Sequence, residues 1–143
     1  MMKRSEKELK RFGVSMEAEL LEQFDQFLKK HKYQNRSEAI RDLIRKALIE
    51  EEWSHNRETV GAITLIYDHH TPGLNQKLNH LQHEFSGKVI TSMHIHLDHR
   101  HCLEVIIARG RARDVKTLAD SLIALRGVKY GTLTGATTAK DLH

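Results

Sequence analysis

Several features are scarce in this chain of 143 residues, and each scarcity excludes a class of protein. The chain contains one cysteine. It therefore cannot form an internal disulfide, which favours a reducing compartment such as the cytoplasm. No apolar run is long enough to cross a bilayer, and the first residues lack the apolar core of a signal peptide. We therefore expect a cytoplasmic protein without a membrane partner, folded as one ordinary domain or two small ones.

Histidine, in contrast, is abundant and clustered. Eight of the eleven histidines lie within residues 69–101, directly before the single Cys102. His94 and His96 fall on one face of a predicted strand, and a short turn would return Cys102 to their side. Imidazole and thiolate are ligands for borderline and soft metal ions. These three residues are therefore candidate metal ligands, and His83 is a candidate fourth whose origin, from the same or a second chain, the spacing leaves open.

A plainer interpretation of the same residues competes with a metal site. Histidine-rich stretches are often solvated, and a lone cysteine is usually a small buried hydrophobe. Two imidazoles on one face of an apolar strand nevertheless need polar partners. This requirement favours a metal site, although it does not select the metal.

The first third of the chain predicts a strand followed by two helices. Apolar and polar residues alternate over Arg11–Met16, which is typical of a strand with one apolar face. Helical spacing follows over residues 17–31, and Asn35 with Glu38 is placed like a capping box at the start of a second helix. Such a unit cannot bury its apolar faces alone. We expect two chains to pair their strands antiparallel, as in a ribbon-helix-helix (βαα) dimer.

The remainder predicts a second domain with a different periodicity. We expect three parts of the chain: an N-terminal domain with an arm at 1–52, a linker at 53–59 and a second domain, which holds the candidate metal ligands, at 60–143. The second domain has the order βαββαβ, the ferredoxin-like (ACT-like) arrangement, so that the fold class is α+β. Its predicted strands and helices, in chain order, are 60–68, 74–85, 89–97, 102–108, 115–125 and 128–133.

The polar face of the first strand offers groups that can read DNA. A two-stranded ribbon fits the major groove, where arginine and serine bind base edges. The start of the second helix would face phosphate with its backbone amides. An ordinary amphipathic strand and helix cap explain either feature alone, but two-fold symmetry and a basic arm favour DNA. The candidate DNA-binding residues are Arg11, Gly13, Ser15, Asn35, Arg36 and Ser37.

In combination these motifs resemble the nickel-responsive transcriptional regulators of the ribbon-helix-helix class. The resemblance covers nearly the whole chain after about residue 10, and the combination of His-x-His-x5-Cys with an upstream Gln-His is highly specific. The matching stretches are RFGVSM (11–16), YQNRSEAIRD (33–42), LQH (81–83), HIH (94–96), HCLE (101–104) and LRGVK (125–129).

The resemblance implies a homotetramer that binds one Ni²⁺ per subunit in square-planar geometry. His94, His96 and Cys102 would come from one subunit and His83 from its neighbour, while Glu104 would orient a ligand. The loaded protein would bind a palindromic operator and repress nickel-uptake genes. Gly13 departs from the family, which usually has serine or threonine there, so we expect an altered operator sequence.

Three further hypotheses complete the sequence-based predictions. Glu38 and Asp42 lie one helical turn apart and offer carboxylates to a secondary cation, although two solvated acids near a helix N-terminus are an equally good explanation. A zinc-binding ribbon-helix-helix regulator and an antitoxin-type DNA-binding protein are the alternative functions. An enzyme is disfavoured, because no oxyanion hole or oriented base accompanies Cys102.

Overall fold

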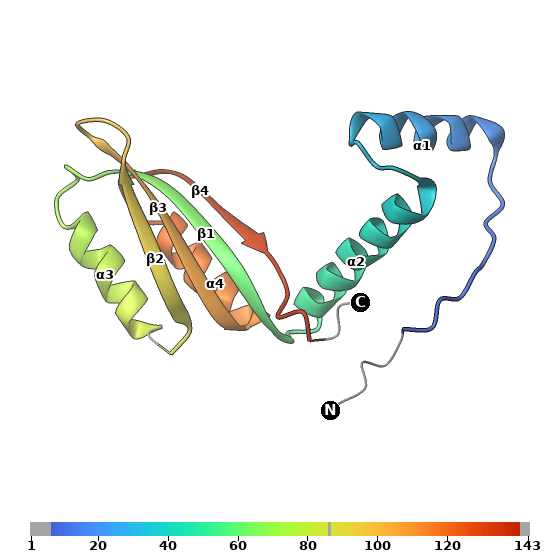
Figure 1. Cartoon of the computed structure of the whole chain (residues 1–143). Helices are drawn as coiled ribbons and strands as arrows, with labels where there is room; N and C mark the ends of the chain where they lie inside the picture. Colours follow the sequence, from blue (N-terminus) through green and yellow to red (C-terminus); the bar gives the residue numbers. More distant parts are fainter. Residues whose placement is uncertain (1–6, 86, 141–143) are drawn as a thin grey trace, which may run out of the picture. The chain divides into compact units, whose positions relative to one another are not determined.

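The computed structural model describes residues 7–85 and 87–140, which divide into two compact units after Asp42 (Figure 1). In this part of the chain no helix is long and apolar enough to span a membrane. The elements, in chain order, are α1 (Ala18–Lys30), α2 (Arg36–Ser54), β1 (Glu58–Asp68), α3 (Leu74–Glu84), β2 (Val89–His96), β3 (His101–Arg111), α4 (Ala112–Ile123) and β4 (Val128–Gly135).

Short polar contacts fix the turn between α1 and α2. The Asn35 side-chain oxygen accepts a hydrogen bond of 2.9 Å from the Glu38 amide, so the predicted cap at the start of α2 is present. Arg36 donates from Nε and Nη2 to the two carboxylate oxygens of Asp25 on α1, at 2.9 and 3.0 Å. This pairing lowers the pKa of Asp25, chiefly through the hydrogen bond from Arg36. The start of α2 is thus held against α1.

The predicted strand Arg11–Met16 does not form within one chain. Residues 7–17 lie in no helix or strand, and the apolar side chains of Phe12 and Val14 are 72% and 60% exposed. The reason is physical: a strand needs hydrogen-bonding partners on a neighbouring strand. No other strand occurs among the described residues that precede α2. The alternating pattern therefore leaves an unpaired segment with an uncovered apolar face.

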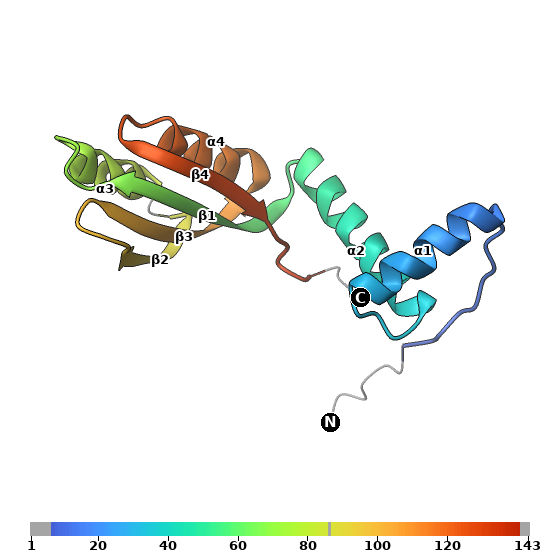
Figure 2. The ribbon, with the colours of Figure 1, turned by 90° about the horizontal axis from the view of Figure 1, so that it is seen from above.

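The second unit is a four-stranded antiparallel sheet in the order β2-β3-β1-β4, with α3 and α4 on one face (Figure 2). This topology is the predicted ferredoxin-like arrangement. The covered face buries every second residue of β1 and β3, as expected for a half-buried sheet. The core also contains Leu74 and Leu78 of α3 and Leu118 and Leu122 of α4.

The strand register sets which residues are neighbours on the covered face. Cys102 pairs with Tyr67 on one side and with His96 on the other. In the next row of this face, Glu104 pairs with Leu65 and His94. Residues directly opposite each other in antiparallel strands point to the same face. The register therefore brings both strand histidines to the side of the sheet that carries the buried cysteine.

The segment between α2 and β1 is shorter than predicted. The helix continues through Ser54 and β1 begins at Glu58, so that only residues 55–57 connect them. Trp53 packs against the core of the sheet domain, and its indole Nε1 donates to the Ala136 carbonyl at 2.9 Å. This contact joins the end of α2 to the segment that follows β4.

Gly127, in the turn before β4, has a conformation and surroundings that exclude a side chain. Its φ is +98°, and an added Cβ would lie 2.5 Å from the hydroxyl oxygen of Thr71. Gly73 also has a positive φ, of +75°, but the first neighbour of its Cβ would be Gln76 Oε1 at 3.8 Å. A side chain at Gly73 would therefore meet backbone strain alone, whereas a side chain at Gly127 would meet both backbone strain and steric crowding.

We predict that Gly127→Ala lowers the free energy of unfolding by roughly 2–4 kcal/mol and Gly73→Ala by only about 1 kcal/mol, because only the first adds a clash to the left-handed strain. Chemical denaturation at a fixed protein concentration measures both values. Equal destabilisation by the two variants would contradict the role of Thr71 in this turn.

Candidate metal centre

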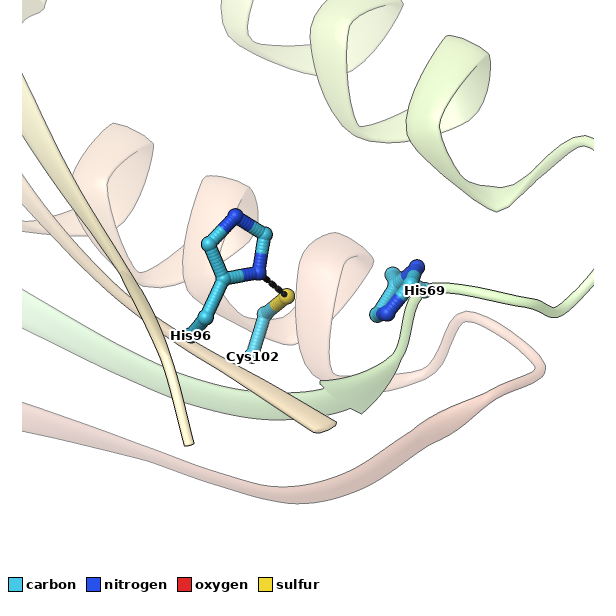
Figure 3. A group of neighbouring side chains, drawn as sticks. All are labelled: His69, His96 and Cys102. Atoms are coloured by element: carbon cyan, nitrogen blue, oxygen red, sulfur yellow. Dashed lines mark hydrogen bonds between the residues drawn. The ribbon is translucent and has the colours of Figure 1, made fainter. Parts of the chain in front are cut away.

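The β2–β3 hairpin brings an imidazole and the thiol into direct contact. The Cys102 Sγ lies 3.4 Å from the Nδ1 of His96, and Cys102 is fully buried while the imidazole is exposed (Figure 3). The His94 ring stands beside that of His96, with ring centroids 5.0 Å apart. Three of the four predicted ligands are therefore neighbours within one chain. Nitrogen and sulfur donors at this spacing fit a borderline or soft transition ion.

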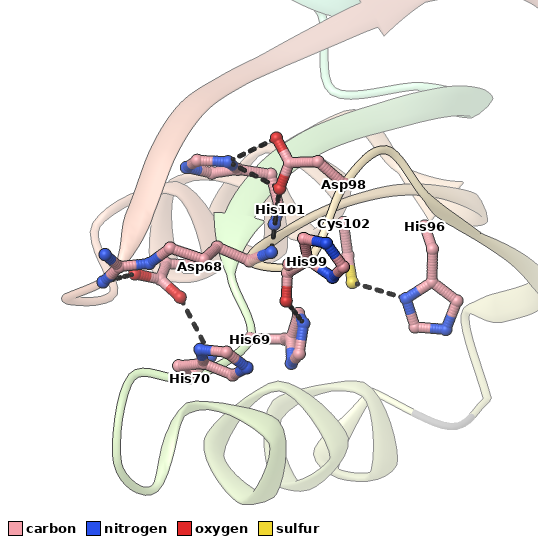
Figure 4. Close-up of polar contacts among 9 residues, drawn as sticks. Asp68, His69, His70, His96, Asp98, His99, His101 and Cys102 are labelled. Atoms are coloured by element: carbon pink, nitrogen blue, oxygen red, sulfur yellow. Dashed lines mark hydrogen bonds and ion pairs between the residues drawn. The ribbon is translucent and has the colours of Figure 1, made fainter.

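A tightly bonded turn holds the hairpin in this register. Asp98 accepts hydrogen bonds from the backbone amides of Arg100 and His101, both at 2.8 Å, and contacts the His101 ring at 3.0 Å (Figure 4). These donors, first the Arg100 amide and then the His101 ring, hold the pKa of Asp98 far below its usual range. Asp98 therefore stays ionised, and the turn positions Cys102 at the start of β3.

The surroundings of Cys102 favour the protonated thiol before a metal binds. Burial raises its pKa, and the negative charges of Asp98 and Glu104 raise it further. A metal ion that binds this sulfur must therefore displace the thiol proton.

Tyr67 and Glu104 form a buried polar layer next to the candidate ligands. The Tyr67 hydroxyl lies 3.1 Å from the Nδ1 of His94. Glu104 is 7% exposed and accepts a hydrogen bond of 3.2 Å from the side chain of Gln82 on α3. Burial, followed by the charges of Glu104 and Cys102, raises the pKa of Tyr67 well above its ordinary value, so its hydroxyl is neutral. Tyr67 therefore orients the ring of His94, whereas Glu104 is positioned next to the ligands by its contact with α3.

His83, the fourth predicted ligand, lies apart from the hairpin cluster. It is exposed in the last turn of α3, next to Gln82. Among the described residues, the group whose ligand atoms lie within 4.8 Å of one another consists of His69, His96 and Cys102. Neither His83 nor His94 belongs to this group.

His69 is the site residue that sequence reasoning missed. It directly follows β1, and its Nε2 lies 2.6 Å from the His99 carbonyl, while its amide donates to the Arg100 carbonyl at 2.8 Å. These contacts tie it to the β2–β3 turn, so that it lies close to Cys102. In the sequence, His69 lies two residues after Tyr67. This position points to the cluster only when β1 is known to pair with β3, because that pairing places Tyr67 opposite Cys102.

The predicted DNA-binding residues lie in the first unit and are exposed. Arg11, Gly13 and Ser15 belong to the unpaired segment, whereas the remaining three surround the start of α2. The possible secondary cation pair differs from a free carboxylate pair, because the Tyr33 hydroxyl donates a hydrogen bond to Asp42. Glu38 lies one helical turn earlier and is half-buried. A cation site at Glu38 and Asp42 stays a prediction.

Two family descriptions match separate parts of the chain. Residues 60–136 match the family "NikR C terminal nickel binding domain", and residues 10–51 match "Ribbon-helix-helix protein, copG family". The first match contains the sheet and the hairpin cluster. The second spans the unpaired segment and most of α2. Both predicted domains thus have a family equivalent.

Whole-chain relatives carry the same combination. A nickel-responsive regulator of Desulfovibrio desulfuricans is 52% identical over 134 residues, which cover 94% of this chain and 97% of the relative. One of Geobacter sulfurreducens is 53% identical, with coverage of 93% and 96%. An uncharacterized protein from Thermotoga maritima, at 12% identity, aligns with a TM-score of 0.51 over 57% of this chain and all of its own, which shows the fold alone.

The family is one of transcriptional regulators and not of enzymes. It unites a ribbon-helix-helix domain with a nickel-binding domain, which are the two folds that the sequence predicted and the matches identify. The chain therefore belongs to the nickel-responsive regulator family.

Proposed function

We propose that this chain is a nickel-dependent repressor that binds palindromic operator DNA when loaded with Ni²⁺ and thereby controls nickel-uptake genes. The observation that carries the proposal is the 3.4 Å contact between Cys102 Sγ and His96 Nδ1 in a chain whose relatives are named nickel-responsive. Residues 1–52 would bind DNA and residues 60–143 would bind metal and assemble, in the cytoplasm.

The proposed nickel site takes three ligands from one subunit and His83 from a neighbour. His94, His96 and Cys102 share the covered face of one hairpin. His83 is exposed on α3 and outside their cluster, which suits a residue that reaches across an interface. A thiolate with three imidazoles suits a d⁸ ion in planar coordination, and each subunit would bind one Ni²⁺. Glu104 would support the ligands from the buried layer.

The uncovered face of the sheet supports the proposed homotetramer. Ile95, Leu103, Ile66 and Tyr130 are paired in sequence across all four strands. They lie in a row on the face opposite the helices, and Ile95 and Tyr130 are 44% and 56% exposed. A continuous apolar row on an open sheet face is costly in water and favours burial against another copy.

The first unit supports DNA binding through a second chain. Its unpaired segment alternates exposed apolar side chains with Arg11, Gly13 and Ser15. Pairing two such segments antiparallel would cover the apolar face and present the polar face to the major groove. We propose that Arg11 and Ser15 read bases, and that Asn35, Arg36 and Ser37 hold phosphates. Gly13 has no side chain for base reading, so it would change the operator sequence.

We predict that Tyr67→Phe lowers nickel affinity about tenfold or more, because the ring of His94 loses the hydroxyl that orients it. Thr117→Val is the matched control, since it also removes one hydroxyl, from the exposed side of α4, where that hydroxyl donates only to the Arg113 carbonyl. Titration of each purified variant against a competing chelator gives both affinities. If Tyr67→Phe binds nickel as tightly as the control, the hydroxyl has no role in the site.

We predict that nickel strengthens DNA binding at least tenfold in the unmodified protein but not in Cys102→Ser, because serine does not supply the thiolate. The probe is DNA selected from a random library by the nickel-loaded protein. Equal binding with and without nickel would contradict the proposed repressor.

On this DNA, Arg11→Ala should cost roughly 1–3 kcal/mol of binding free energy and relax the specificity at one base position, whereas Arg36→Ala should weaken binding to all sequences.

A further inference from the structure

An open pocket lies at the end of the sheet domain where β1 finishes, and the proposed function does not use it. Its volume is about 410 Å³, which is within the range of pockets that hold small molecules. Its charged side chains are three cations, Arg100, Arg126 and Lys129, and one carboxylate, Asp68. With His70 counted as neutral, the three cations exceed the single carboxylate by two positive charges.

The carboxylate of the pocket is fully engaged inside the protein. Asp68 is buried, and its Oδ1 accepts a hydrogen bond of 2.9 Å from the backbone amide of His70 (Figure 4). Its Oδ2 accepts one of 2.8 Å from Nη2 of Arg100. The His70 amide contributes most, and Arg100 adds to it, in holding the pKa of Asp68 below its usual value, so that the carboxylate is ionised at neutral pH. Asp68 therefore fixes Arg100 at the pocket wall and neutralises that one cation.

The other two cations of the pocket have no counter-ion. Within the described part of the chain, the side chains of Arg126 and Lys129 form neither an ion pair nor a hydrogen bond. A single exposed cation of this kind is ordinarily solvated, but these two line the same concave site as the fixed Arg100. Like charges gathered in a cleft reinforce one another's field and draw in an anion.

The remaining donors of the pocket suit an oxyanion. A guanidinium has five N–H groups, so Arg100 can bind a second anion while it stays paired with Asp68. The hydroxyl of Thr71 also lines the pocket and makes no hydrogen bond within the described residues. Guanidinium groups match the oxygen spacing of phosphate, and an ammonium adds a point charge. We propose that this pocket binds a phosphate dianion, either free phosphate or the phosphoryl group of a small metabolite.

The charge balance favours such a dianion over the DNA backbone. A phosphomonoester carries close to two negative charges at neutral pH, which equals the excess positive charge of the pocket. A phosphodiester carries one and would leave one cation uncompensated. The site is also separate from the predicted nickel ligands, none of which lines the pocket. Bound phosphate would connect the β2–β3 turn, through Arg100, with the turn before β4, through Arg126.

Equilibrium dialysis of the metal-free full chain against labelled inorganic phosphate tests the inference, at constant ionic strength set with chloride and at pH 8, where the dianion dominates. We expect saturable binding of one phosphate per chain. Arg126→Gln and Lys129→Gln should each weaken phosphate binding at least fivefold. Both side chains are exposed and without internal partners, so both variants should keep the circular dichroism of the parent.

Arg113→Gln is the matched control. It removes the same charge from an exposed site at the other end of the sheet domain, beside Asn56, and should change phosphate affinity less than twofold. An equal loss in Arg113→Gln and Arg126→Gln would show general charge attraction and overturn the pocket. Absence of saturable binding at millimolar phosphate would also overturn it.

Two further ligands identify the source of the phosphate. A sugar phosphate that binds more tightly than inorganic phosphate would support the site and assign it to a metabolite, whereas weaker binding would support the site and assign it to the free ion. Dimethyl phosphate, a monoanionic diester, should bind at least tenfold more weakly than inorganic phosphate. Equal affinity for the diester would point to the DNA backbone and contradict the proposed dianion site.

Discussion

The register of the β2–β3 hairpin is the constraint on which the metal chemistry of this chain depends. It places His96 opposite Cys102 and His94 opposite Glu104, all on the face that α3 and α4 cover. A shift of one residue would turn the histidines to the other face of the sheet and leave the cysteine alone. Asp98 stabilises the register by accepting two backbone amides and contacting His101 in the connecting turn. The turn at residues 97–100 thus sets the position of His96 relative to Cys102.

Both units expose apolar surface that a second copy can cover. Phe12 and Val14 are exposed in the first unit, and Ile95 and Tyr130 in the second. The proposed tetramer would also have to bring His83 of one subunit to the hairpin of another. A metal ion shared across such an interface favours one arrangement of subunits over others, which is the energetic requirement for nickel-controlled DNA binding.

The sequence predicts most of the fold because its periodicity is regular, and it fails where contacts depend on partners. The four strands of the second unit were predictable from alternating apolar residues, and Asn35 from its capping position. The strand predicted at Arg11–Met16 is not formed in the single chain, because the prediction requires hydrogen bonds from the same segment of a second chain. His69 escaped notice because its distance from Cys102 depends on the pairing of Tyr67 with Cys102, which local spacing does not reveal.

The most direct test of the central claim is a complementation experiment with two inactive variants. His83→Ala keeps the hairpin donors, and Cys102→Ser keeps His83. If nickel bridges subunits, neither variant alone shows the absorption band of the complete four-ligand nickel site, and mixing them after unfolding and joint refolding restores part of it. Mixed assemblies that show no more of the band than the separate variants would contradict a site shared between subunits.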